Sequence, residues 1–274
     1  MIAMTIDQIR QPILNEYNLF LEEYQRRTQS NVVLLEQVVD YLNQIPGKQL
    51  RPLLVLLSAK ACQHLSPLHI KLATAIEMLH NASLMHDDVV DESNSRRQHD
   101  SVRHRWGNQV AVLCGDYFLA QVMSLLQEVG NRLASEYLAH TVAMMSQGEL
   151  MQLDAVHKKV KASSYIDIIG SKTASLLATC CQFGSLAPQG SIPTSYTKAL
   201  YDFGYHYGIV FQIRDDMNDF NQDHDVALPD DVSPLQLIEE HTLLAQQAIK
   251  QLPDTPARQT MLDMLLPSAP QPVC

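Results

Sequence analysis

Two short aspartate-rich motifs are the part of the chain whose residue types and spacing could bind metal. The first lies in the stretch ASLMHDDVVDESNSRR, from Ala82 to Arg97, and the second in QIRDDMND. Each has two adjacent aspartates and a third one three residues later: Asp87, Asp88 and Asp91 in the first, and Asp215, Asp216 and Asp219 in the second. We expect the two motifs to form two walls of one site that holds divalent metal.

The chemistry of these motifs follows from crowding carboxylates on one helical turn. Asp87 and Asp91 share a helix face, and Asp88 is rotated from Asp87 by about 100°. Like charges at this spacing destabilise a helix and, near its C-terminal end, oppose the helix dipole, so a cation must compensate them. Oxygen ligands without cysteine or histidine favour a hard ion, Mg²⁺ before Zn²⁺. Because Mg²⁺ completes its shell with phosphate oxygens and water, the pair predicts a site that holds a diphosphate through metal.

A charge run on a helix is more often only a solvated face, so each motif alone is a weak signal. Here both copies follow largely apolar stretches, ATAIEMLHNASLMH and DFGYHYGIVFQIR. The acids therefore stand where a buried helix bundle meets solvent, and helix bundles build metal sites from such facing side chains. The pair favours a metal site over a solvated face.

Length and composition predict one all-α domain over residues 1–274, with residues 266–274 as a disordered tail. Apolar residues make up 46% of the chain and there are only 10 glycines, which allows a large core and favours helix. The net charge of −10 argues against nucleic-acid binding, which depends on many Lys and Arg contacts to phosphates. Any phosphate must be held locally or through metal.

Five cysteines, without a CxxC pair or zinc-site spacing, predict reduced thiols in the cytoplasm. The N-terminal segment carries charge early and lacks the apolar core of a signal peptide, and no window reaches ~18 uninterrupted apolar residues. We therefore expect a soluble, unprocessed protein with no membrane span.

Apolar periodicity predicts helices that carry these motifs. One covers residues 6–27, and a second begins near Ser30 or Asn31 and stops at the Pro46-Gly47 break. The continuous apolar run 53–57 predicts a central helix with an exposed basic start, and Ser66-Pro67 starts the helix that ends in the first motif. Further helices are expected at about 109–129, 132–157, 163–185, 194–221, 232–251 and 256–265.

The stretch from Glu92 to Asn108 is expected to be a loop, and no alternating strand pattern is present. It forms a basic island in an acidic chain, with Arg96, Arg97, His99, Arg103, His104 and Arg105.

Six blocks in this order resemble trans-isoprenyl diphosphate synthases of the polyprenyl synthetase family, over about residues 30–222. The blocks are GKQLRP (47–52), HNASLMHDDVVDESNSRR (80–97), VLCGDYFLA (112–120), GELMQL (148–153), KTASL (172–176) and FQIRDDMNDF (211–220). The resemblance implies an isoprenoid synthase helix bundle with a central cavity, usually a homodimer. It also implies the reaction, a head-to-tail condensation of isopentenyl diphosphate with an allylic diphosphate.

The resemblance assigns roles residue by residue. The six aspartates would hold Mg²⁺ against the allylic diphosphate, directly or through water, and Arg96 and Lys172 would neutralise the same leaving group. Thr173 and Gln212 would face the developing allylic cation. The isopentenyl diphosphate would be bound by Lys48, Arg51, His80 and Arg97. Cations aimed at the departing diphosphate favour the transition state, because the leaving group gains charge as its bond breaks.

Each of these residues also has an ordinary structural explanation. Lys48 or Arg51 alone is a helix-start cation, and His80 alone is more often a core histidine. Thr173 and Gln212 could equally be buried polar groups that hydrogen-bond within the bundle.

The turn before the first motif predicts the product length. Ala82 and Ser83 lie about one turn below Asp87, and both are small. Aromatic side chains at these positions close the tunnel early in the family, so the resemblance implies a product longer than C20, such as a quinone side-chain precursor. The next candidate stops are Leu79 and Met78, the latter roughly 13 Å below Asp87.

The chain departs from the family pattern after Asp219. The family continues through a loop rich in Gly and Lys and a TLP-containing element, whereas this chain reads NQDHDVALPDDVSPLQLIEEHTLLAQQ. One diphosphate contact, the loop lysine, and the closing loop that excludes water would then be missing. Smaller departures are Pro46 and Gln49, where the family usually has glycine and a basic residue.

More than one function stays open. We expect an active synthase with a shortened flap, because the six aspartates and the basic set remain. The alternative is a shortened homologue, weakly active or inactive, that acts as a partner subunit. A terpene cyclase would use the same metal cluster but needs no isopentenyl diphosphate site, and a non-enzymatic helical scaffold is the remaining interpretation.

Overall fold

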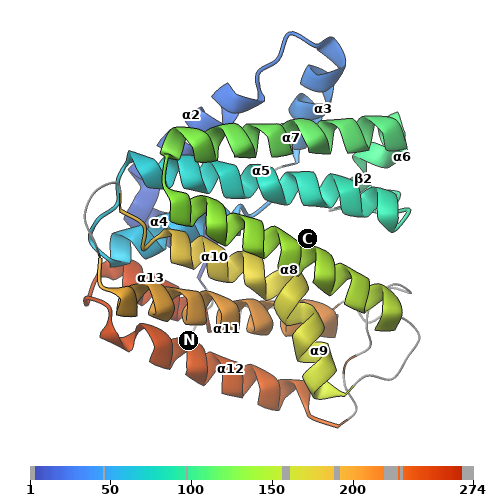
Figure 1. The fold of residues 1–274 in the computed structure, drawn as a ribbon. Coiled ribbons are helices and arrows are strands. Elements are labelled where there is room, and N and C mark those ends of the chain that lie inside the picture. Colours follow the sequence, from blue (N-terminus) through green and yellow to red (C-terminus); the bar gives the residue numbers. More distant parts are fainter. Residues whose placement is uncertain are drawn as a thin grey trace.

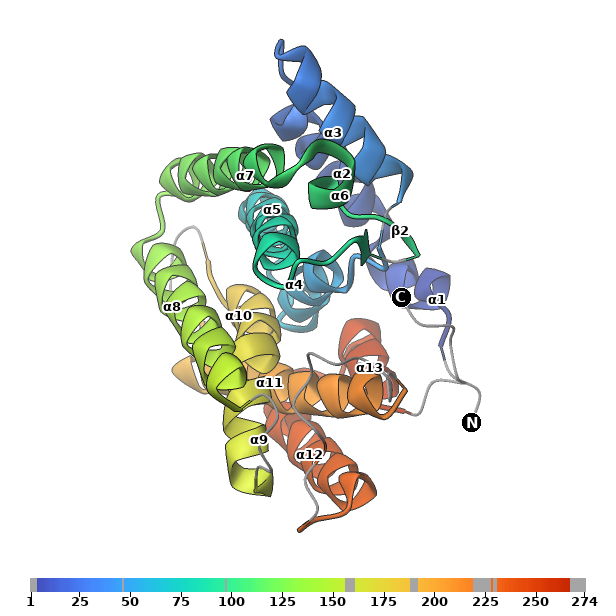
Figure 2. The same ribbon diagram turned by 90° about the vertical axis from the view of Figure 1, so that its right-hand side faces the viewer.

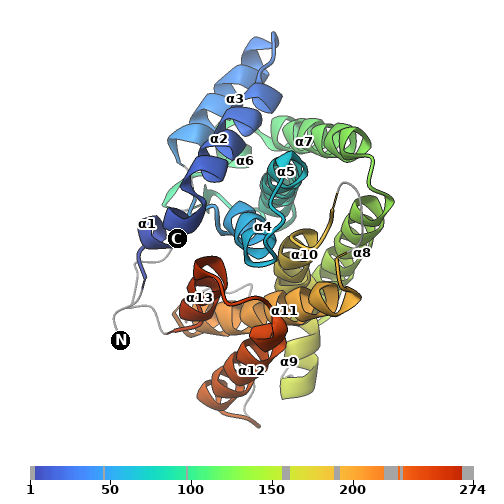
Figure 3. The ribbon, with the colours of Figure 1, turned by 90° about the vertical axis from the view of Figure 1, so that its left-hand side faces the viewer.

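The computed structural model describes residues 4–45, 47–96, 98–155, 161–187, 192–218, 228 and 231–266. These residues form a helix bundle, which confirms the all-α prediction (Figure 1). Figure 2 looks along α5 (Pro67–Val90), which lies in the middle of the bundle with α4 (Leu50–Ala61), α7 (Asn108–Val129) and α10 (Ser175–Phe183) around it. In Figure 3 α3 (Val33–Gln44) lies at the top of the molecule and α12 (Pro234–Ala248) at the bottom, whereas α13 (Pro256–Asp263) packs against α4 and the N-terminal turn η1 (Gln11–Ile13).

The N-terminal helices differ from the predicted pattern at proline and serine. The expected helix over residues 6–27 is interrupted by a 3-10 turn that contains Pro12, whose ring cannot donate a backbone hydrogen bond. The next helix does not begin at Ser30 or Asn31, because the Ser30 hydroxyl accepts a hydrogen bond from the Val32 amide at 3.1 Å in a turn before it. The elements are α1 (Ile6–Arg10), η1 (Gln11–Ile13), α2 (Leu14–Thr28) and α3 (Val33–Gln44).

The two central helices follow the prediction closely. All five residues of the run 53–57 in α4 are fully buried, as their continuous apolar character indicates. α5 begins with a capping box between Ser66 and His69 and has Pro67 in its first turn, and it ends at Val90, inside the first aspartate motif. These two helices pack against each other, and α7 runs along α5.

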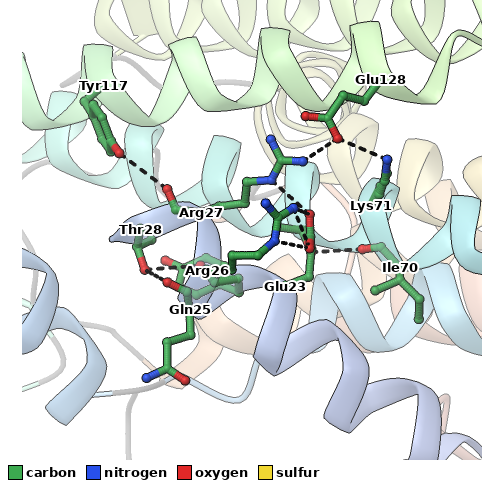
Figure 4. A network of polar contacts seen from close by, with 11 residues as sticks. Glu23, Gln25, Arg26, Arg27, Thr28, Ile70, Lys71, Tyr117 and Glu128 are labelled. Atoms are coloured by element: carbon green, nitrogen blue, oxygen red, sulfur yellow. Dashed lines mark hydrogen bonds and ion pairs between the residues drawn. The ribbon is translucent and has the colours of Figure 1, made fainter. Parts of the chain in front are cut away.

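An ion-pair network fixes α5 between α2 and α7 (Figure 4). Arg27 of α2 is 8% exposed and pairs with Glu128 of α7 and, at 2.9 Å, with Glu23. Lys71 of α5 lies 3.0 Å from the same Glu128 carboxylate. Hydrogen bonds from Arg27 and Lys71 lower the pKa of Glu128 to about 2, so the carboxylate stays charged. The network lies near the start of α5, and the aspartate motif lies at its other end.

The segment from Glu92 to Asn108 is more ordered than the loop we expected. It forms a two-strand antiparallel hairpin, β1 (Ser95–Arg96) and β2 (His99–Asp100), and a short helix α6 (Val102–Trp106). Strands of two residues are too short for a periodic pattern to predict. Arg103 of the basic island connects α6 to the start of the segment. Its guanidinium donates to the Glu92 carbonyl at 2.8 Å and to the Asn94 side chain at 2.9 Å.

The second half of the bundle contains one break inside a predicted helix. The region 163–185 is not one α-helix, since a π-helical turn, η2 (Gly170–Ala174), separates α9 (Ala162–Ile169) from α10. Such turns often occur at functional sites, and this one carries Lys172 and Thr173. The remaining elements are α8 (Arg132–Ala155), α11 (Thr194–Asn218), α12 (Pro234–Ala248), η3 (Ile249–Gln251) and α13 (Pro256–Asp263).

α7 is long and apolar enough to cross a membrane by length and composition alone, and one third of its most apolar window is buried. One such helix is weak evidence for a membrane span, and α7 packs along α5. The predicted tail lies almost wholly outside the described residues, apart from Leu266.

Candidate active site

The first aspartate motif occupies the last turn of α5. Asp88 is 2% exposed, and Arg96 of β1 donates from Nε to its Oδ1 at 2.7 Å, while Nη2 of the same guanidinium forms an ion pair with this oxygen at 2.7 Å. Burial raises the pKa of Asp88, and the charge of Arg96 opposes that shift. Asp91 caps the helix, since its amide donates to the Asp87 carbonyl at 2.8 Å. Among the described residues of the basic island, Arg96 forms an ion pair with this motif.

Lys172 lies across the bundle from this motif, on the π-helical turn. Its Nζ is 2.7 Å from Glu149 Oε2 and 3.1 Å from Gln152 Oε1, both on α8. A Cβ added to Gly148 would lie 2.5 Å from the Lys172 amide nitrogen, so only glycine allows α8 to approach the turn this closely. Glu149 and Gln152 belong to the GELMQL block, but their spacing along the chain does not predict a contact with Lys172, about 20 residues later.

The charges of both Arg96 and Lys172 act on Asp87. Burial raises its pKa to about 6; the charge of Glu149 and, more weakly, Asp91 act in the same direction, and Lys172 and Arg96 oppose them. Asp87 is half-buried, and a carboxylate in such a place near two other carboxylates favours a bound cation, which would reverse the shift in its pKa. The structure therefore places Lys172 and Arg96 where their charges act on the first motif, and their role toward a diphosphate stays a prediction.

The second motif ends α11 and is held by uncharged donors. Asp215 is exposed, whereas Asp216 is half-buried and accepts hydrogen bonds at both oxygens. Gln212 Nε2 donates to Oδ1 at 2.7 Å, and the Tyr165 hydroxyl of α9 donates to Oδ2. Thr173 Oγ1 in turn donates to Gln212 Oε1 at 2.9 Å.

These contacts bear on two predictions. Thr173 and Gln212 do hydrogen-bond within the bundle, as their ordinary structural explanation requires, and their role toward an allylic cation stays a prediction. Tyr165 was missed, because nothing in its local sequence indicates a contact with a residue 51 positions away. Asp219 and Arg97 lie outside the described residues.

The predicted isopentenyl diphosphate residues lie on two neighbouring helices. Lys48 is exposed just before α4, Arg51 is half-buried in its first turn, and His80 is 8% exposed on α5. The charge of Arg51 acts on Tyr207 and on Cys180, which places its guanidinium toward the interior of the bundle. Gln49, between Lys48 and Arg51 in the sequence, has a left-handed backbone with φ of 51°. Its side-chain oxygen accepts a hydrogen bond from the Tyr17 hydroxyl of α2.

The predicted chain-length residues follow one another down α5. Ala82, Met78 and Leu79 are buried, with exposures of 0%, 0% and 3%. Ser83 is half-buried, and its hydroxyl donates to the His80 carbonyl at 2.9 Å. Neither residue of the critical turn carries a bulky side chain, and the product length stays a prediction.

The donor set fits a hard divalent cation. Both motifs offer carboxylate oxygens at helix ends, which is the chemistry that Mg²⁺ prefers. Within the described ranges, no three His, Cys, Asp or Glu side chains gather closely enough to hold a metal ion by themselves. Because Mg²⁺ keeps waters and takes phosphate oxygens, a site split over two helix ends is suited to a cation shared with a diphosphate.

Comparison with known proteins agrees with this geometry. A family model described as polyprenyl synthetase matches residues 32–251. Heptaprenyl diphosphate synthase component 2 of Geobacillus stearothermophilus is 38% identical over 200 residues, which cover 73% of this chain and 62% of that protein. The chain thus spans about three fifths of the length of this curated relative.

Solved structures show the same fold. A decaprenyl diphosphate synthase from Rhodobacter capsulatus superposes with a TM-score of 0.84 at 28% identity, covering 95% of this chain and 97% of that one. A polyprenyl synthase from Caulobacter crescentus CB15, complexed with calcium and isoprenyl diphosphate, gives a TM-score of 0.88 at 23% identity over 97% of both chains.

Proposed function

The chain belongs to the polyprenyl synthetase family, and we propose that it is a Mg²⁺-dependent all-trans polyprenyl diphosphate synthase. Its substrates would be isopentenyl diphosphate and an allylic diphosphate. The observation that carries the proposal is the pair of aspartate motifs at the ends of α5 and α11, with Lys172 and Arg96 beside the first. The Caulobacter structure, which has the same fold and is complexed with calcium and isoprenyl diphosphate, supports a site for a divalent cation and a diphosphate.

The aspartates and the basic residues would have separate roles in binding the two diphosphates. Bound Mg²⁺ would supply positive charge against the departing diphosphate, held by Asp87, Asp88, Asp91 and the aspartates of the second motif. Lys172, kept in place by Glu149 and Gln152, would add a fixed cation, so that little reorganisation is needed when charge develops. Lys48, Arg51, His80 and Arg97 would bind the second diphosphate directly, because cations are what an anionic group needs where no metal is present.

The deciding assay uses purified protein with Mg²⁺, isopentenyl diphosphate and an allylic primer, and follows diphosphate release. Release that requires both substrates and Mg²⁺ supports the synthase. No release from a protein with an intact fold would instead favour the partner-subunit alternative, which the name of the Geobacillus relative, a component 2, specifically suggests.

We propose a product longer than C20, which the small Ala82 and Ser83 support. Ser83→Phe places a ring one turn below the motif and should shorten the product by one or more isoprene units. Mass spectrometry of the products measures this. A wild-type enzyme that makes only C15 or C20 products would contradict the proposal.

We propose that the enzyme is a cytoplasmic homodimer. Four free cysteines among the described residues fit a reducing compartment. Large apolar side chains project from α7 and α8: Leu113 is 67% exposed, Met123 is 70% exposed and Leu150 is 66% exposed. We propose that these side chains belong to one apolar patch that a second copy of this chain covers, because association of two copies would remove them from water.

Sedimentation velocity tests the homodimer. Leu113→Glu should convert dimer to monomer, and Leu235→Glu on α12, where the native leucine is 60% exposed, is the matched control and should not. A wild-type monomer would contradict the proposal, and wild-type binding to lipid vesicles that Leu113→Glu abolishes would assign the patch to a membrane instead.

A further inference from the structure

We infer that Tyr165 is a positioning residue: its hydroxyl fixes the direction of the Asp216 carboxylate and thereby the strength with which the second motif binds a metal–diphosphate pair. The inference rests on the proposed function, since it concerns the same site.

The ring and the hydroxyl of Tyr165 have different surroundings. The residue is 0% exposed, and its ring packs in an apolar cluster with Ile169 of α9 and with Ile209 and Ile213 of α11. A phenylalanine would fill this space equally well. The hydroxyl, however, donates to Asp216 Oδ2, so packing does not account for it. A buried tyrosine hydroxyl needs a partner, and this one lies in the proposed metal site.

The Asp216 carboxylate is held from both sides. Tyr165 donates to one oxygen and Gln212 to the other, and the Gln212 amide is itself oriented by the hydrogen bond from Thr173. Two donors in fixed positions define the plane of the carboxylate. Both donors are neutral, so they orient the negative charge without cancelling it. Asp215, the next residue along the chain, is exposed and is not oriented by Tyr165.

α9, which carries Tyr165, contacts the chain at two places: in the second motif, and just after the segment that follows that motif. Asp216 lies before that segment, and Asp231 lies after it. Asp231 Oδ1 accepts a hydrogen bond from the Ala162 amide, the first amide of α9, at 2.9 Å. The helix is therefore held at its start by Asp231 while Tyr165, one turn later, reaches Asp216. This arrangement keeps the hydroxyl in place, as a positioning residue requires.

The test is binding of inorganic diphosphate in the presence of Mg²⁺, measured by isothermal titration calorimetry without prenyl substrates. Tyr165→Phe keeps the ring and removes the hydroxyl, and we expect affinity to fall about tenfold, the effect of losing one hydrogen bond to a charged group. Tyr201→Phe is the matched control, because Tyr201 lies on α11 about 20 Å before Asp215. The thermal midpoint without metal shows whether each variant folds.

A double variant separates positioning from general packing. If Tyr165 acts through Asp216, then Tyr165→Phe combined with Asp216→Asn should bind diphosphate like Asp216→Asn alone. The inference is overturned if Tyr165→Phe binds like wild type, or if the two effects simply add. A wild-type protein that binds no diphosphate with Mg²⁺ would refute the proposed function itself, whereas wild-type binding that Asp215→Ala abolishes but Tyr165→Phe leaves unchanged refutes only the inference.

Discussion

The two aspartate motifs end two long helices in the same sequence pattern, yet the protein holds them by different means. In the first, Asp88 is almost fully buried and pairs with the charged Arg96, eight residues further along the chain. In the second, Asp216 accepts hydrogen bonds from the neutral Gln212 and Tyr165, and its neighbour Asp215 faces solvent.

This difference shows that two motifs of the same pattern can be held by different chemistry: an ion pair at Asp88, and hydrogen bonds from neutral side chains at Asp216. The first motif has Arg96 and Lys172 nearby, so part of its negative charge is compensated before any metal binds. The hydrogen bonds at the second motif orient a carboxylate but leave its charge unchanged.

The largest effect should come from removing one carboxylate from either motif. Asp87→Ala and Asp215→Ala should each lower kcat/KM about a thousandfold, because several kcal/mol of charge stabilisation depend on the metal they hold. Asp254→Ala is the control, since that side chain is 92% exposed in a different part of the fold. Turnover that keeps its Mg²⁺ dependence in either motif variant would refute the metal assignment for that motif.

Acid should destabilise α5, the helix of the first motif, at its N-terminal end. Burial lowers the pKa of His69, in the first turn of α5, to about 4, with the nearby His64 acting in the same direction. Its stabilising contribution is present above pH 6.5, the unfolded value, and is lost as pH falls toward 4, at a cost of about 3 kcal/mol.

His69→Gln tests this directly, since glutamine can replace the histidine in the capping box with Ser66. Urea unfolding of the variant should depend less on pH between 6.5 and 4 than that of wild type. His241→Gln gives the comparison for α11, the helix of the second motif. His241 lies on α12 and contacts His206 of α11, and burial lowers the pKa of His241 to about 4. An unchanged pH profile in His69→Gln would show that α5 is not the acid-sensitive element.

Removal of the counter-charge distinguishes the two motifs further. Arg96→Met leaves Asp88 buried without its ion-pair partner, and the free energy of unfolding without metal should fall by about 2 kcal/mol. Mg²⁺ with diphosphate should restore part of the loss, as a bound cation can replace the guanidinium. Arg132→Met, which removes an exposed ion pair with Glu136, should cost less than about 0.5 kcal/mol. Equal losses in the two variants would contradict the comparison.

The smallest effect is expected beside the second motif. Asp231→Ala removes the acceptor for the first amide of α9 and should lower the free energy of unfolding by about 1 kcal/mol. Asp231→Asn keeps an acceptor oxygen and should retain most of the stability. If chemical denaturation finds alanine and asparagine alike, the hydrogen bond does not stabilise α9.

Local spacing determined much of this protein from the sequence alone. The run 53–57 predicts a buried helix, Ser66-Pro67 predicts the start of α5, and both motifs are correctly placed at helix ends. These features depend on residues a few positions apart, which helix geometry brings together in any fold. The order of the six sequence blocks was sufficient to identify the family.

Tertiary structure decided which side chains meet across the bundle. The contact of Tyr165 with Asp216 and that of Glu149 with Lys172 join different helices, so they depend on how helices pack and not on spacing along one of them. The π-helical turn that presents Lys172 likewise lies where Gly148 lets α8 come close. Sequence spacing thus located the carboxylates, and packing selected the donors and cations that hold each of them.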